Sequence, residues 1–203
     1  MNKVSLPADR LSPGKSVVIA NAPDGFSSLV AADLARNFAA RAKTGSRRIL
    51  VVCRDAERMA AFERALDFFA PGLSVLTFPA WDCLPYDRVS PNPSVSARRM
   101  ATLAVLARDG SDPGIVLTTV NALLQHVPAR DVIDAQSVVM KAGNVRPMDD
   151  IIRWLEMNGF SRTSTVRDVG EYAVRGGILD LYVPGTAAPV RLDFFGDTLE
   201  TIK

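Results

Sequence analysis

The sequence predicts an α/β fold in two parts: a parallel-sheet domain over residues 1–128 and a small α+β domain with a mainly antiparallel sheet over 129–203. In the first part, short apolar runs alternate with stretches of helical period, the pattern of strands joined by crossover helices. In the second part, one helix precedes several short strands separated by turn residues. The 203 residues are 48% apolar and 23% charged, as in an ordinary globular protein of one large or two small domains.

Four apolar runs predict the strands of the parallel sheet, at 17–20, 49–53, 73–77 and 114–118. These runs are continuous rather than alternating, which is typical of parallel strands covered on both faces. The stretches between and after them predict helices over 26–43, 55–69, 94–108 and 119–127. Residues 78–93 carry four prolines and no helical period. They are predicted to form an ordered loop, because Trp81 and Tyr86 are costly to leave in water.

The sequence pattern changes near residue 130. Beyond that point it predicts a helix over 147–158 that begins near Pro147 and stops at Gly159. The remaining residues predict strands at 163–167, 171–175, 178–183, 189–195 and 198–202. Glycine and proline turns, such as Gly176-Gly177, separate these strands.

Composition excludes several classes of site. Two cysteines, Cys53 and Cys83, are too few for a disulfide framework or a zinc cage, and their apolar neighbours predict buried side chains. The single histidine, His126, cannot build a metal site and is predicted to lie at a helix end. No metal or cofactor is therefore expected. The sequence shows neither a secretory signal nor about 18 consecutive apolar residues, so no membrane contact and a cytoplasmic location are predicted.

Charge is nearly balanced, since 24 basic and 22 acidic residues give a net charge of +2. A general basic surface for nucleic acid is not predicted. Weak DNA binding through two local pairs, Arg47-Arg48 and Arg98-Arg99, stays open as an alternative.

The turn after the first predicted strand is where a phosphate-binding P-loop would lie, and it lacks that chemistry. Residues 21–28 hold one glycine, Gly25, and no lysine, while Pro23 removes an N–H group and Asp24 faces the expected phosphates. The run Gly14-Lys15-Ser16 precedes the strand instead of following it, so we interpret it as a chance match. ATP binding is therefore not expected.

Two stretches, 170–180 and 189–197, resemble a region shared by the excinuclease protein UvrB and the transcription-repair coupling factors of bacterial nucleotide excision repair. Residues 78–82, 84–87 and 90–91 look specifically like the coupling factors. The resemblance covers nearly the whole chain from about residue 15. It implies that residues 1–128 are a degenerate helicase-like (P-loop-type) domain. It also implies that residues 129–203 are an adaptor domain that recruits the excinuclease protein UvrA to stalled transcription complexes.

Two departures separate this chain from UvrB, which has a working Walker A loop and a tyrosine-rich β-hairpin. Here the loop is degenerate, and the corresponding stretch 81–93 is short and holds only Tyr86. The resemblance thus implies an N-terminal, non-catalytic part of a coupling factor with no small-molecule substrate. RNA polymerase and DNA would be bound only by C-terminal domains outside this chain. The alternative is an ATP-dependent, damage-binding protein like UvrB.

Residues 191–195 are predicted to form a strand with two different faces. Side chains alternate along a strand, so Leu192 and Phe194 point one way and Arg191, Asp193 and Phe195 the other. The first pair suits a core. If the second face meets solvent, Phe195 is a candidate interface anchor, because aromatic and arginine side chains dominate binding hot spots.

The resemblance implies that Arg175, Arg191 and Phe195 contact UvrA. An arginine fork binds a carboxylate through two hydrogen bonds, which lysine cannot reproduce. The alternatives left open by the residues alone are that Phe195 is buried against the helix at 147–158, and that Arg191 and Asp193 form a weak surface pair.

Overall fold

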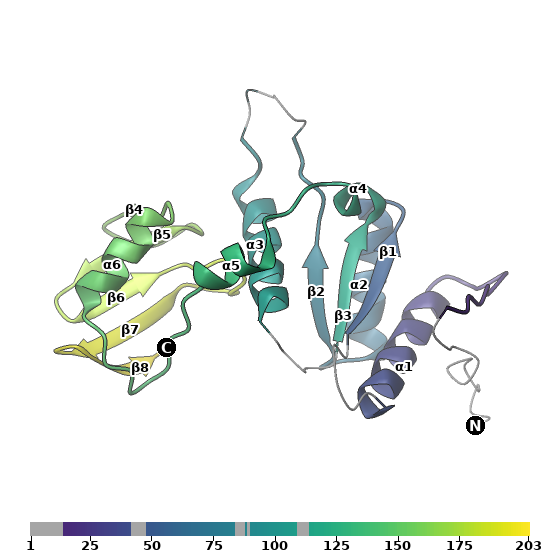
Figure 1. Ribbon diagram of the computed structural model, residues 1–203, viewed down its shortest axis with the longest axis horizontal. Helices are drawn as coiled ribbons and strands as arrows, with labels where there is room; N and C mark the ends of the chain where they lie inside the picture. Colours follow the sequence, from purple (N-terminus) through teal and green to yellow (C-terminus); the bar gives the residue numbers. More distant parts are fainter. Residues whose placement is uncertain (1–13, 42–47, 84–87, 89, 109–113) are drawn as a thin grey trace. The chain divides into compact units, whose positions relative to one another are not determined.

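The computed structural model describes residues 14–41, 48–83, 88, 90–108 and 114–203 (Figure 1). The chain divides into two compact units, one formed by residues 1–81 and 108–127 and the other by 82–107 and 128–203. Helix α3 (Pro93–Ala107) therefore groups with the C-terminal residues. The predicted domain division into 1–128 and 129–203 stays a prediction.

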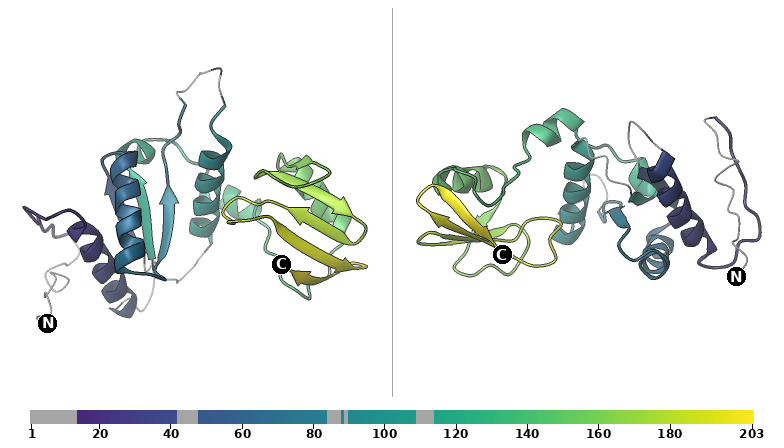
Figure 2. Two further views of the ribbon diagram at one scale, coloured as in Figure 1. Left: turned by 180° about the vertical axis from the view of Figure 1, so that it is seen from behind. Right: turned by 90° about the horizontal axis from the view of Figure 1, so that it is seen from below.

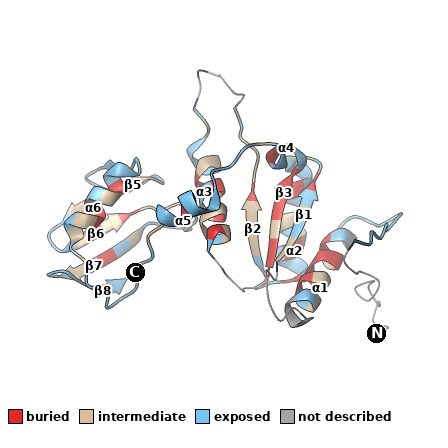
Figure 3. Ribbon diagram, viewed as in Figure 1, coloured by how far each residue is buried: buried red, intermediate tan, exposed pale blue. Residues whose placement is uncertain are grey.

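The first unit contains the predicted parallel sheet. Its strands lie in the order β1 (Arg48–Cys53), β3 (Gly114–Thr119), β2 (Ser74–Phe78), and both pairings are parallel. Helices α1 (Phe26–Arg41) and α2 (Ala56–Phe69) pack against each other and against the sheet. The central strand β3 is the most buried of the three (Figure 3). The core of this unit consists of Ala31, Ala32, Ala35, Cys53, Met59, Leu66, Ala70, Ile115 and Leu117.

Residues 17–20 form no strand, so that prediction is wrong. Val17, Val18 and Ile19 are exposed, and none of the three strands of the first unit pairs with them. An apolar run becomes a strand only when a neighbouring strand pairs with its backbone, and a propensity for strand cannot supply that neighbour.

The helix expected over 119–127 is much shorter, since α4 covers only Val120–Leu123. The Thr119 hydroxyl caps its first turn by accepting a hydrogen bond from the Ala122 N–H at 3.3 Å. Pro128 disfavours helical geometry at the residue before it, and the chain leaves the helix at Leu124. No helix in the described ranges combines the length and apolar character that crossing a membrane requires.

The second unit holds a five-stranded sheet in the order β4 (Ser161–Arg162), β5 (Glu171–Arg175), β6 (Ile178–Leu181), β7 (Val190–Phe195), β8 (Thr198–Ile202). All neighbours are antiparallel except β4 and β5, which confirms the predicted mainly antiparallel sheet. The strand predicted at 163–167 is wrong, because only residues 161–162 pair with β5 before the chain turns away. A short helix, α5 (Arg130–Ala135), was not predicted.

Helix α6 (Met148–Met157) covers one face of this sheet, called here the inner face (Figure 2). The predicted helix at 147–158 is thereby confirmed, and the carboxylates of Asp149 and Asp150 lie in its first turn, where the helix dipole favours negative charge. The Tyr172 hydroxyl donates a hydrogen bond to Glu156 Oε1 at 2.7 Å, which satisfies the polar end of a buried ring. The buried core of this unit consists of Ile151, Leu155, Tyr172, Leu179, Leu181, Leu192 and Leu199.

Candidate protein-binding face

The face of the sheet opposite α6, called here the outer face, brings the three candidate residues together. Arg175 pairs with Ile178 and Ile178 with Asp193, while Asp180 pairs with Arg191, so these side chains share one face. Phe195 lies at the end of β7 on the same face and is 78% exposed. Phe195 is therefore not buried against α6, and the alternative that placed it in the core is wrong.

The alternation predicted for 191–195 is confirmed. Leu192 is buried and Phe194 packs against the same core, whereas Arg191 and Phe195 are exposed. A period of two residues follows from strand geometry alone, and the register shift between Asp193 and Phe194 leaves it intact.

Arg191 is held by a carboxylate on the neighbouring strand. Its Nε and Nη2 donate to the two carboxylate oxygens of Asp180 at 2.7 and 2.9 Å, a two-point ion pair across β6 and β7. Asp193 binds Lys203 Nζ at 2.8 Å and accepts a hydrogen bond from the Thr201 hydroxyl at 2.7 Å. Arg191 and Asp193 therefore do not form the surface pair with each other. Arg191 pairs with Asp180 instead, and Asp193 pairs with Lys203.

Arg175 is fixed by the chain that follows β4. Its Nη2 donates to the Ser164 carbonyl oxygen at 2.7 Å and to the Thr165 hydroxyl at 3.3 Å. A guanidinium has five N–H donors, so donors of both arginines remain for a partner's carboxylate. Because both side chains are held in one geometry before binding, less side-chain entropy is lost when a partner docks.

The two carboxylates of the outer face stay ionised over a wide pH range. The hydrogen bond from Arg191 lowers the pKa of Asp180 below its usual value, and the positive charges of Arg191 and Arg175 lower it further against the opposing effect of burial. The hydrogen bonds from Lys203 and Thr201 lower the pKa of Asp193 in the same direction. The face therefore carries alternating fixed charges beside an exposed aromatic ring.

The pKa of Asp180 gives a testable pH dependence. A carboxyl whose pKa is lowered by folding stabilises the protein above its unfolded pKa of about 4, and this contribution disappears as pH falls through the folded pKa. We expect the free energy of unfolding to fall as the pH drops below about 4, and to fall less steeply in Asp180→Asn. Urea unfolding between about pH 2 and 6 measures both slopes. Met157→Ala, a change of an exposed and uncharged side chain in the same unit, should keep the wild-type slope. An unchanged slope in Asp180→Asn would contradict the assignment.

Sequence reasoning missed the residues that hold the arginines: Asp180, Ser164 and Thr165. Asp180 lies 11 positions before Arg191, and only the register of β6 against β7 shows that they face each other. The turn at Gly176-Gly177, which joins β5 to β6 and so brings Arg175 beside Ile178, was predicted. Gly176 has a φ of +59°, and a Cβ at Gly177 would lie 2.6 Å from the Phe194 carbonyl oxygen, so both positions suit glycine.

The region where a P-loop would lie is a groove of about 980 Å³ in the first unit, lined by residues 22–28, by β1 and by part of α2. Its basic side chains are Arg54, which pairs with Asp55 at 2.8 Å, and Arg58, which lies 3.6 Å from the Asp24 carboxylate. Asp24 thus places negative charge where a phosphate would need donors, and no lysine lines the groove among the described residues.

The remaining candidate residues do not gather into a site. Arg99 is 1% exposed, so the idea that Arg98 and Arg99 together contact DNA is wrong. Cys53 is buried as predicted, whereas Cys83 is only half-buried, so the prediction for Cys83 is wrong. Burial, and then the charge of Asp55, raises the pKa of the Cys53 thiol. His126 is exposed beyond α4, and the described part of the chain holds no cluster of three potential metal ligands. Arg47 and Tyr86 lie outside the described residues.

Comparison with known proteins identifies relatives of both units. Residues 138–203 match the family described as UvrB interaction domain. The transcription-repair-coupling factor of Rickettsia prowazekii is 34% identical over 155 residues, which are 76% of this chain and 14% of that protein. Its counterpart in Myxococcus xanthus is 35% identical over 161 residues, 76% of this chain and 13% of that protein. The Escherichia coli protein is 33% identical over 129 residues, 64% of this chain and 11% of that protein.

This chain thus spans only a small part of the length of the curated relatives it matches. The similarity extends well beyond the matched UvrB interaction domain at residues 138–203, because the alignment covers 155 residues. It also includes part of the first unit, since the second unit contains fewer than 155 residues. The chain belongs to the family of the transcription-repair-coupling factors and carries a UvrB interaction domain over residues 138–203.

Proposed function

We propose that the chain is a non-catalytic adaptor in transcription-coupled nucleotide excision repair, and that its outer face recruits UvrA to stalled transcription complexes. The observation that carries the proposal is Phe195, a phenylalanine 78% exposed on a folded strand and flanked on the same face by Arg175 and Arg191. The names of the matched family and of the relatives agree with a role in repair.

The chemistry of the outer face indicates what UvrA should present. A phenylalanine ring in water favours transfer into an apolar pocket, which provides affinity. The unused donors of Arg175 and Arg191 favour carboxylates beside that pocket. Asp180 and Asp193 repel a partner that places acids directly over them, so the alternating charges fix the orientation of docking.

Titration of the chain with purified UvrA tests the proposal. We expect saturable binding that weakens with rising salt, because exposed charges contribute to it. Absence of saturable binding by a folded chain would contradict the adaptor role. Contacts with RNA polymerase and DNA are proposed only for parts of the longer relatives outside the stretch that this chain matches.

We also propose that the first unit is a degenerate helicase-like (P-loop-type) domain that supports the adaptor and binds no nucleotide. The parallel sheet supports the relationship, and Asp24 with its neighbour Arg58 supports the loss of phosphate binding.

We expect no saturable uptake of ATP with magnesium by this chain, because the groove offers a carboxylate where a phosphate requires N–H donors and a lysine. Isothermal titration with ATP and magnesium measures it, with a working P-loop ATPase as the positive control. Saturable ATP binding that ADP competes away would favour the alternative, an ATP-dependent protein like UvrB.

A further inference from the structure

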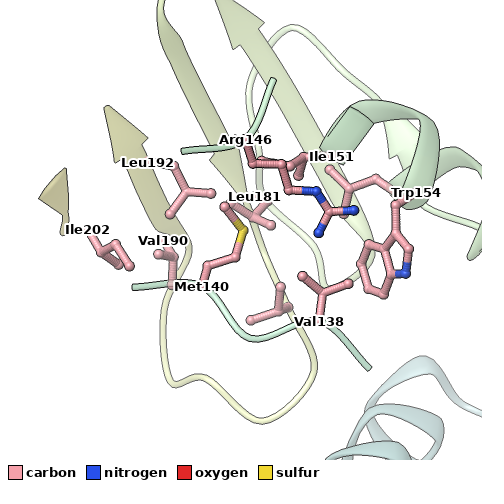
Figure 4. A pocket seen from close by; sticks show the side chains of 11 residues that line it. Val138, Met140, Arg146, Ile151, Trp154, Leu181, Val190, Leu192 and Ile202 are labelled. Carbon is pink, nitrogen blue, oxygen red and sulfur yellow. The ribbon is translucent and has the colours of Figure 1, made fainter. Parts of the chain in front are cut away.

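A second candidate site lies within the UvrB interaction domain, between α6 and the inner face of the sheet. It is a cavity of about 220 Å³ lined by ten apolar side chains and one arginine, Arg146 (Figure 4). Trp154 of α6 and Met140 form part of its wall. For comparison, a cavity of about 150 Å³ accepts a benzene ring, so this one has room for one large apolar side chain.

Arg146 gives the cavity a charged wall. Its backbone N–H is fixed by a hydrogen bond to the Asp197 carbonyl oxygen at 2.7 Å, and its half-buried side chain lies among the apolar residues of the wall (Figure 4). Across the described ranges, its guanidinium makes no hydrogen bond or ion pair. A cation against apolar walls is stabilised by an acidic partner, and a carboxylate matches the guanidinium fork.

The segment Val138–Met140 borders the same cavity and resembles a strand without a partner. Val138 and Met140 line the cavity while Val139 between them is 56% exposed, so neighbouring side chains point to opposite sides. Backbone N–H and C=O groups of these three residues make no backbone hydrogen bond to any described residue. Backbone groups that reach solvent bond to water, and an added extended peptide replaces that water with backbone hydrogen bonds by β-augmentation.

We propose that this site binds an extended peptide segment of a partner protein that brings one bulky apolar side chain with a carboxylate beside it. The peptide backbone pairs with Val138–Met140, the apolar side chain enters the cavity, and the carboxylate binds Arg146. A fatty acid could fill the cavity with its chain and pair its carboxylate with Arg146, but it has no backbone groups to hydrogen-bond with Val138–Met140. A peptide offers all three contacts and is therefore favoured. The site lies between α6 and the inner face of the sheet, whereas Phe195 lies on the outer face. The proposed peptide binding therefore does not depend on the proposed binding of UvrA.

The two tryptophans of the chain, Trp81 and Trp154, allow a direct test by NMR of the ¹⁵N-labelled protein. The probe is an acetylated and amidated hexapeptide of threonines with phenylalanine at its third position and aspartate at its fifth, because side chains two residues apart lie on the same face of an extended peptide. We expect the indole signal of Trp154 to shift on titration while that of Trp81 does not. A matched peptide with asparagine in place of aspartate should bind about tenfold more weakly, because it lacks the charged acceptor.

Two variants tie this preference to the arginine. Arg146→Gln should abolish the preference for the aspartate peptide, and Arg146→Lys should retain part of it. Arg153→Gln, which changes an exposed arginine of α6 that pairs with Asp150, is the control and should bind as the wild type. A Trp154 signal that the peptide leaves unchanged at millimolar concentration, equal binding of both peptides by the wild type, or tighter binding of decanoate than of the peptide would each overturn the proposal.

Discussion

Replacing Phe195 by alanine is expected to weaken binding of UvrA by about tenfold to a hundredfold, or about 1–3 kcal/mol, while the chain stays folded. The ring is 78% exposed, so its removal costs the folded protein little packing. In a complex, the same ring would be buried and the change would remove its full contribution to the interface. Titration of variant and wild type with UvrA gives the affinity ratio, and urea unfolding gives the stability of each.

Phe68→Ala is the matched control, because this phenylalanine of α2 in the first unit is 80% exposed and does not belong to the outer face. It should leave UvrA binding unchanged. If Phe195→Ala binds as tightly as the wild type, or if both variants lose affinity equally, the outer face is not the docking surface.

The parts of the fold that follow from local periodicity could be predicted from the sequence. The continuous run Ile49–Cys53 predicted a strand of a parallel sheet, and β1 is one. The alternation around Phe195 predicted that Phe195 shares a face with Arg191 and lies opposite Leu192 and Phe194, because a strand's two-residue period does not depend on which strands lie beside it. Both predictions needed only residues close together in the sequence.

Features that depend on distant residues could not be predicted. The segment at 17–20 has the composition of a strand, yet no described strand pairs with it. Arg99 looks like a surface charge in the sequence but is buried. The partner of Arg191 is Asp180 rather than the nearer Asp193, because strand register decides which side chains meet. The grouping of side chains along β7 was therefore predictable, whereas the exposure of that face and the contacts that fix its arginines were not.

Leu155→Ala is expected to cost the second unit about 2–5 kcal/mol of stability. Leu155 is fully buried on α6 and belongs to the core formed with Tyr172, Leu179 and Leu192. Its removal leaves a cavity between the helix and the inner face of the sheet in addition to the lost transfer free energy. Urea unfolding followed through Trp154, which lies on the same helix, measures the loss.

Met157→Ala is the matched control on α6, since this side chain is 79% exposed and its loss should change stability by less than about 0.5 kcal/mol. Leu155→Ala should also lower UvrA binding, but only in proportion to the fraction of chain that unfolds. Binding should therefore recover at lower temperature or lower denaturant, whereas the loss in Phe195→Ala should persist under every condition in which the chain is folded. A wild-type unfolding midpoint for Leu155→Ala would mean that α6 does not support the sheet. The outer face would then owe its shape to the strands alone.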